Sequence, residues 1–110
     1  NDNSPCLDLI LLGLGDDGHT ASLFPGTDSL NVRNSLTTVS TGKGKKRITL
    51  TASAISSASK VIFLVSGEGK QVALKRLLDP NESYKRTPAK LIRPDSEIVL
   101  LVDKAASALL

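Results

Sequence analysis

The segment Asp17-Gly-His19 combines the residue types that acid–base chemistry needs. His19 is the only histidine of the 110 residues, and histidine is the side chain that ordinarily changes charge near neutral pH. A neutral imidazole can take a proton from water, while a nearby carboxylate holds its tautomer and stabilises the cation that forms. Asp17 is close in sequence, but a bend at Gly18 is needed before the two side chains can meet. The pattern predicts a general base at His19 with Asp17 as its companion.

Glycines surround this segment and follow the apolar run Leu7-Asp-Leu-Ile-Leu-Leu12. A buried strand that ends in a glycine turn delivers side chains to the rim of a sheet, where α/β proteins bind ligands. Such a turn also lets a substrate approach the backbone, so Gly15 and Gly18 are candidate substrate-binding positions. Together with Gly13 they imitate a dinucleotide fingerprint. Pro25-Gly26 interrupts the long helix that this fingerprint requires, which argues against a nicotinamide or flavin cofactor.

Three cations stand where a phosphate group would bind. Arg47 opens an expected strand, Lys43 belongs to the basic cluster 43–47, and Lys70 lies where the glycine turn 66–70 enters an expected helix. A helix N-terminus favours anions, and a lysine there adds a point charge. The competing interpretation of each is a solvated surface residue. The turn lacks the G-K-[ST] ending of a Walker loop, which argues against ATP hydrolysis.

Alternating strands and helices predict an α/β fold with a parallel or mixed sheet and flanking helices. The continuous apolar character of the first strand indicates burial on both faces. Val72, Ala73, Leu77 and Leu78 are expected to share the buried face of the best helix. Residues 19–24 are expected to form one helical turn. Strands are expected at 7–12, 47–51, 61–65, 90–93 and 98–102, with a short one near 36–40, and helices at 51–59, 70–78 and 104–110.

Composition limits the classes of protein. The length allows one domain, and 40% apolar residues with a mean hydropathy of zero indicate a soluble globular chain. No run approaches the ~20 apolar residues of a membrane span. One cysteine and one histidine do not make a metal site, and the single cysteine, Cys6, suits a reducing compartment such as the cytoplasm. The net charge of +3 comes without the aromatic residues that stack on bases, which argues against a nucleic-acid partner.

The longest informative stretch, Leu9–Gly26, resembles the signature of the 6-phosphogluconolactonases. The likeness continues in segments 47–51, 61–70, 88–94 and 102–106, in the correct order along the chain. The related glucosamine-6-phosphate deaminases share Asp-Gly-His but continue differently. The continuation Thr20-Ala-Ser-Leu-Phe24 is similar to the lactonases.

The resemblance implies an enzyme of the oxidative pentose phosphate pathway with the fold of the sugar-phosphate isomerases and deaminases. It would hydrolyse 6-phospho-D-glucono-1,5-lactone to 6-phospho-D-gluconate without a metal or organic cofactor. His19 would be the general base and Asp17 its polar companion. Arg47 would bind the substrate phosphate, and Lys70 matches the lysine of the family's glycine turn.

Two departures from the family accompany this resemblance. The family's Lys-Pro-Pro segment is replaced by Thr41–Lys46, so that either Lys43 or Lys45 would be its phosphate lysine. Family members are also much longer, so residues 1–110 are expected to be the C-terminal half of the domain, and the first residue is not methionine. Association or fusion with a glucose-6-phosphate dehydrogenase stays open. The alternatives are an amino-sugar-phosphate deaminase or isomerase, and a non-catalytic binding fragment.

Overall fold

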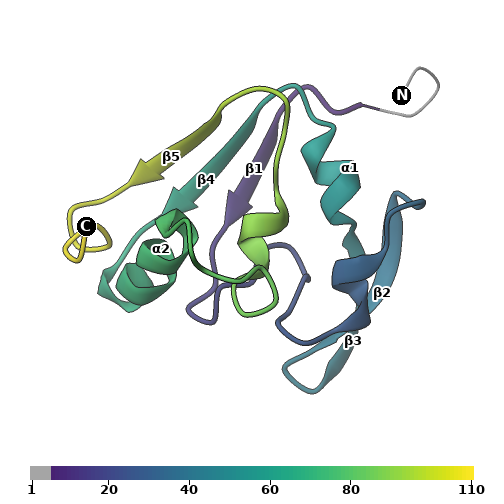
Figure 1. Ribbon diagram of the computed structural model, residues 1–110, viewed down its shortest axis with the longest axis horizontal. Coiled ribbons are helices and arrows are strands. Elements are labelled where there is room, and N and C mark those ends of the chain that lie inside the picture. Colours follow the sequence, from purple (N-terminus) through teal and green to yellow (C-terminus); the bar gives the residue numbers. More distant parts are fainter. Residues whose placement is uncertain (1–5) are drawn as a thin grey trace.

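Parallel pairing organises the main sheet of the computed structural model, which describes residues 6–110 (Figure 1). Its three strands are β1 (Ile10–Gly13), β4 (Val61–Val65) and β5 (Ile98–Val102), in the order β1-β4-β5. Ile10 lies opposite Val61, and Val61 lies opposite Ile98. The predicted α/β class with a parallel sheet is confirmed. Because the strands are parallel, the glycine turns after β1 and β4 leave the sheet at the same edge.

Two helices follow β3 and β4 in the chain. Helix α1 (Ala52–Ser56) begins after Thr51, whose hydroxyl oxygen accepts the Ala54 N–H at 3.1 Å. It ends before the predicted boundary at residue 59. Helix α2 (Gln71–Leu78) agrees with the predicted helix at 70–78.

The buried face of α2 is narrower than predicted. Ala73 and Leu74 are fully buried and Leu77 is partly buried, whereas Val72 and Leu78 are about half exposed. The face is set by contact with the core, which reaches only one side of this short helix.

The core covers one face of the sheet and leaves the other open. On the covered face, Phe63 of β4 is fully buried and packs in one cluster with Ile55 of α1 and Leu74 of α2. On the other face, Leu11 is 57% exposed and Leu64 is 48% exposed. Burial of the first strand on both faces was therefore predicted wrongly, since no element between residues 6 and 110 covers its second face. We call Leu9, Leu11, Leu64 and Leu101 the open sheet face; all are 48–57% exposed.

A separate β-hairpin carries the basic cluster. Strands β2 (Thr37–Gly42) and β3 (Lys45–Leu50) pair antiparallel, with Gly42 opposite Lys45. Lys43 and Gly44 form the connection, with φ values of 53° and 77°. Positive φ at both central positions is the geometry that matches the twist of hairpin strands. The strands predicted near 36–40 and at 47–51 are thus confirmed, and Figure 1 shows their hairpin beyond α1, away from β5.

Short 3-10 helices replace part of the expected structure. They are η1 (Asp28–Asn31), η2 (Glu68–Lys70) and η3 (Pro88–Leu91). The strand predicted at 90–93 is wrong, because η3 covers the first half of that segment and residues 92–93 form neither a helix nor a strand. Pro88 stands at its first turn, where the fixed φ of proline suits a helix and its missing N–H costs nothing.

The helix predicted at 104–110 is also wrong, since this segment forms turns. The Asp103 carboxylate accepts the Ala106 N–H at 2.9 Å, as a cap would, but Ala106 is the one apolar residue of the segment in the core. A seven-residue helix with so little packing is not stable. No helix among residues 6–110 is long and apolar enough to cross a membrane.

Candidate active site

The turn after β1 folds back on itself and presents His19 at the carboxyl edge of the sheet. The Gly18 N–H donates to the Gly15 carbonyl at 2.9 Å, and the Gly15 N–H donates to the His19 carbonyl at 2.8 Å. Thr20, which is buried, donates its hydroxyl to the Gly13 carbonyl at 2.7 Å. These bonds tie His19 to the end of β1.

The helical turn predicted at 19–24 is wrong. Thr20 and Leu23 form an isolated antiparallel bridge, and the Leu23 N–H donates to the Thr20 carbonyl at 3.0 Å. Ala21 has a φ of 51°, which a helix does not allow. The buried Leu23 and the bond from Thr20 to β1 fix a tight reverse turn instead.

Asp17 and His19 meet across the bend at Gly18. The carboxylate Oδ1 of Asp17 lies 2.5 Å from His19 Nδ1 and also accepts the His19 backbone N–H at 3.0 Å. Partial burial raises the pKa of Asp17, but the hydrogen bonds from the His19 side chain and backbone, with the charges of His19 and Lys43, outweigh it and lower that pKa overall. Asp17 therefore carries its negative charge at neutral pH.

The second imidazole nitrogen, Nε2, is available to exchange a proton with a substrate or water. The His19 side chain is 21% exposed, and no residue between 6 and 110 hydrogen-bonds to Nε2. Because Asp17 accepts from Nδ1, the tautomer with a hydrogen on Nδ1 leaves a lone pair on Nε2. This arrangement can accept a proton from water.

The two glycines of the turn make space rather than donate to a ligand. A Cβ atom at Gly15 would overlap Nδ1 and Cε1 of His19 and stand 2.8 Å from Asp17 Oδ1. Gly18 has a φ of 89°, and a Cβ there would lie 3.0 Å from the Thr87 Cα. Both N–H groups already donate within the turn. Neither glycine therefore has a free N–H group that could donate to a substrate. The contact of a substrate with Gly15 and Gly18 stays a prediction.

Phe24 links His19 to Arg47, and the sequence alone did not single it out. Its ring stacks on the imidazole with centroids 4.4 Å apart and planes inclined by 28°. The Arg47 Cζ lies 5.3 Å from the Phe24 centroid, and the Arg47 Nε donates to the Gly42 carbonyl at 3.2 Å. A Cβ at Gly42 would overlap the Phe24 ring. The sequence offers two signals, the place of Phe24 in the segment Thr20–Phe24 that resembles the lactonases and the scarcity of aromatics, with two phenylalanines among the 110 residues.

Lys70 shares a hollow with His19. This hollow has a volume of about 390 Å³ and is lined by the end of β1, the following turn and Lys70 at the end of η2. Lys43, at the hairpin tip, is exposed, and its charge acts on Asp17. The structure thus gathers the predicted acid–base pair and the predicted cations at one end of the molecule. Residues 6–110 contain no cluster of three or more His, Cys, Asp or Glu that could hold a metal ion.

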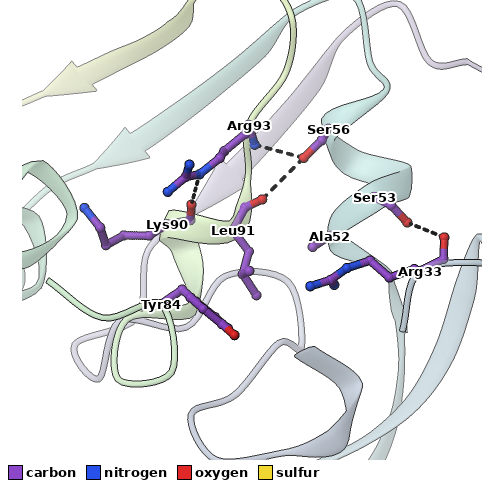
Figure 2. A pocket seen from close by; sticks show the side chains of 8 residues that line it. All are labelled: Arg33, Ala52, Ser53, Ser56, Tyr84, Lys90, Leu91 and Arg93. Atoms are coloured by element: carbon purple, nitrogen blue, oxygen red, sulfur yellow. Dashed lines mark hydrogen bonds between the residues drawn. The ribbon is translucent and has the colours of Figure 1, made fainter. Parts of the chain in front are cut away.

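A second hollow lies between α1 and η3, and none of the predicted site residues lines it (Figure 2). Its polar groups are largely engaged with the backbone. The Arg93 N–H donates to the Ser56 hydroxyl at 2.9 Å, and the Arg93 Nε donates to the Lys90 carbonyl at 3.3 Å. The Lys90 ammonium donates to the Asp79 carbonyl at 2.7 Å. These bonds attach η3 to its neighbours.

Comparison with known proteins shows which family the chain belongs to. The family model described as glucosamine-6-phosphate isomerases/6-phosphogluconolactonase matches residues 1–101. The chain belongs to this family. Within it, the 6-phosphogluconolactonase of Nostoc sp. is 47% identical over 104 residues, which cover 94% of this chain and 43% of that protein.

Solved structures of the family have the same fold. The 6-phosphogluconolactonase of Trypanosoma brucei superposes with a TM-score of 0.82 at 29% identity, over 94% of this chain and 42% of that one. A monomeric glucosamine-6-phosphate deaminase superposes with a TM-score of 0.79 at 29% identity, over 94% of this chain and 48% of that one. The chain spans about two fifths of the length of the curated relatives it matches.

Proposed function

We propose that these residues are part of an enzyme that hydrolyses 6-phospho-D-glucono-1,5-lactone to 6-phospho-D-gluconate. The observation that carries the proposal is the Asp17–His19 pair, 2.5 Å apart, in a hollow that also contains Lys70. Relatives named 6-phosphogluconolactonase support the choice of substrate.

In the proposed reaction, the cations hold the phosphate while His19 acts on water. Arg47, Lys70 and Lys43 would bind the phosphate group, so that binding energy away from the reacting carbon orients the lactone. Nε2 of His19 takes a proton from water as the oxygen attacks the carbonyl carbon. The bond from that carbon to the ring oxygen then breaks, and the ring oxygen receives the proton from the imidazolium. The open-chain carboxylic acid that results ionises in water.

Asp17 acts in this reaction through His19. Its charge stabilises the imidazolium between the two proton transfers and holds the hydrogen on Nδ1 beforehand. The lowered pKa of Asp17 keeps that charge in place at neutral pH. The reaction requires a base, water and phosphate-binding cations, and no cofactor takes part in any step.

Further parts of the proposal concern the longer protein and its surroundings. Residues 1–110 would be the C-terminal part of the domain, and the remainder would contribute another phosphate-binding arginine. The protein would work in the cytoplasm, where a single free cysteine is stable. Association or fusion with a glucose-6-phosphate dehydrogenase stays a prediction, as does the alternative that these residues in isolation are a non-catalytic binding fragment.

An amino-sugar-phosphate deaminase is the second candidate, since such an enzyme superposes with a TM-score of 0.79. The two activities differ in their products. A lactonase releases acid from 6-phosphogluconolactone, whereas a deaminase releases ammonia from glucosamine 6-phosphate. Ammonia release from the amino sugar, without acid release from the lactone, would support the deaminase.

The test of the base is His19→Gln in the full-length enzyme. Loss of a general base typically lowers turnover by roughly 10²–10⁴-fold. The assay follows acid release from the lactone, corrected for spontaneous hydrolysis. Arg93→Lys, in the second hollow, is the matched control and should hydrolyse the lactone at the wild-type rate. Near-normal turnover by His19→Gln would remove His19 from the mechanism.

A further inference from the structure

A loop from a distant part of the chain presses on the bend between Asp17 and His19. Thr87, which precedes η3, is fully buried. Its backbone and side chain lie against Gly18, since a Cβ at Gly18 would come within 3.0 Å of the Thr87 Cα and 3.1 Å of its Cγ2. Two residues later, the Ala89 N–H donates to the Gly18 carbonyl at 3.0 Å. Gly18 is thus held from outside the turn by packing and by a hydrogen bond.

Thr87 is in turn held by Glu82. Its hydroxyl donates to Glu82 Oε2 at 2.8 Å, and its N–H donates to the Ser83 carbonyl at 2.9 Å. The Glu82 side chain is 4% exposed although it is a carboxylate. Arg86 donates to both of its oxygens, at 2.7 and 2.6 Å. Hydrogen bonds from Arg86 and Thr87 lower the pKa of Glu82 to about 2, so the anchor stays charged under all ordinary conditions.

We propose that Thr87, anchored by Glu82, is a positioning residue that fixes Gly18 and so keeps Asp17 within hydrogen-bond distance of His19. Gly18 has a φ of 89°, and the two side chains meet only because the chain bends there. The N–H of Gly18 is bound inside the turn, its carbonyl is bound by Ala89, and Thr87 packs against the position where a side chain would be. A substitution at Thr87 should therefore alter the contact between Asp17 and the His19 imidazole through Gly18, without a change in either of these two residues.

The effect on turnover rests on the proposed function, but the effect on the imidazole does not. His19 is the only histidine of the 110 residues, so its two ring nitrogens are the only histidine signals that this segment gives in a long-range ¹H–¹⁵N spectrum. In the wild-type chain we expect the hydrogen of the neutral ring on Nδ1, facing Asp17. In Thr87→Ala, which loses the Cγ2 contact with Gly18 and the bond to Glu82, we expect the hydrogen to move toward Nε2 in a measurable fraction of molecules.

The kinetic expectation follows from the same geometry. Misplacing a catalytic group by about 1 Å can cost roughly 100-fold in rate, so kcat of full-length Thr87→Ala should fall by roughly 10- to 100-fold. KM should change little, because Thr87 lies in a different loop from Arg47 and Lys70. Thr87→Ser retains the hydroxyl and should restore most of kcat. Lys85→Ala, in the same loop but exposed, should match the wild type in both spectrum and rate.

The outcomes separate the two proposals. A folded Thr87→Ala chain with the wild-type imidazole spectrum would overturn the positioning role. If Thr87→Ala does not fold, Glu82→Gln takes its place, since it weakens the anchor and leaves Thr87 itself intact. A wild-type spectrum there would overturn the anchoring by Glu82. A shifted imidazole spectrum in a protein that does not hydrolyse the lactone would leave the positioning role standing and refute the lactonase.

Discussion

Replacing Gly15 by alanine should expel the imidazole of His19 from its position. The added Cβ would overlap Nδ1 and Cε1 of His19 and stand 2.8 Å from Asp17 Oδ1. Gly15 is not among the glycines with positive φ, so alanine fits its backbone. The effect of the substitution is therefore steric, because the added methyl group occupies volume that the Asp17 and His19 side chains fill.

The size of the effect follows from the contacts that the ring would lose. A hydrogen bond with a charged partner contributes about 1.5–3 kcal/mol, and an aromatic stack such as that on Phe24 contributes about 0.5–1.5 kcal/mol. Asp17 is 38% exposed and His19 is 21% exposed, so solvent weakens the first of these. We expect the free energy of unfolding to fall by about 1–3 kcal/mol. Turnover should fall by roughly 10²–10⁴-fold, as for loss of the base.

Three measurements test this expectation. Urea unfolding gives the stability, the ¹⁵N signals of His19 report the contact with Asp17, and acid release from the lactone by the full-length enzyme gives the rate. Gly69→Ala is the matched control, because a Cβ at Gly69 meets nothing within 4 Å and its φ is not positive. A Gly15→Ala protein with the wild-type imidazole spectrum and rate would refute the packing that we describe.

Other perturbations test separate contacts. Asp17→Asn removes the charge that stabilises the imidazolium, so kcat for lactone hydrolysis should fall by roughly 10²-fold or more. KM for the lactone should change little, because Asp17 does not bind the phosphate. An unchanged kcat would contradict the role of Asp17 as the partner of His19. The pKa of Glu82 is about 2 in the folded chain against an ordinary 4.5. Because the folded value is depressed, its contribution to stability is complete above pH 4.5 and is lost as pH falls toward 2. The gap in urea midpoint between wild type and Glu82→Gln should thus narrow over that range, and a constant gap would argue against this linkage. Thr51→Ala removes the cap of α1 and the hydrogen bond from the Thr51 hydroxyl to the Ser35 carbonyl, and should cost about 1–2 kcal/mol in urea unfolding, whereas Thr51→Ser should cost much less; equal losses would show that the hydroxyl does not stabilise the fold. Gly42→Ala should displace the Phe24 ring, and because this ring contacts both His19 and Arg47, kinetics with the full-length enzyme should show a lower kcat together with a higher KM; wild-type values of both would contradict the role given to Phe24.

The sequence predicted best the features that depend on short segments. The fully apolar run 61–65 forms the central strand β4, and the run 98–102 forms β5 as expected. Because parallel strands share their carboxyl edge, the turns that follow the predicted strands leave the sheet on the same side. In the structure, His19 and Lys70 line one hollow at that edge.

The errors arise where distant contacts decide the structure. Residues 104–110 are rich in alanine, which favours a helix, but only Ala106 of its apolar residues finds a place in the core. Leu91 and Ile92 suggested a strand, but Pro88 begins the 3-10 helix η3. The N–H of its second residue, Ala89, donates to the Gly18 carbonyl. The roles of Phe24 and Thr87 depend on stacking and packing between segments far apart in the chain. No local pattern marks such contacts.

The open sheet face also has a thermodynamic consequence. Water in contact with apolar surface raises the heat capacity by about 0.45 cal/K/mol for each Å². Leu9, Leu11, Leu64 and Leu101 are each 48–57% exposed, so the folded chain retains part of the hydration that a folded protein normally loses. Its heat-capacity change on unfolding should therefore be small for its length. Calorimetry measures this heat-capacity change. An increase in it when another surface covers the open sheet face would give the apolar area that becomes buried there.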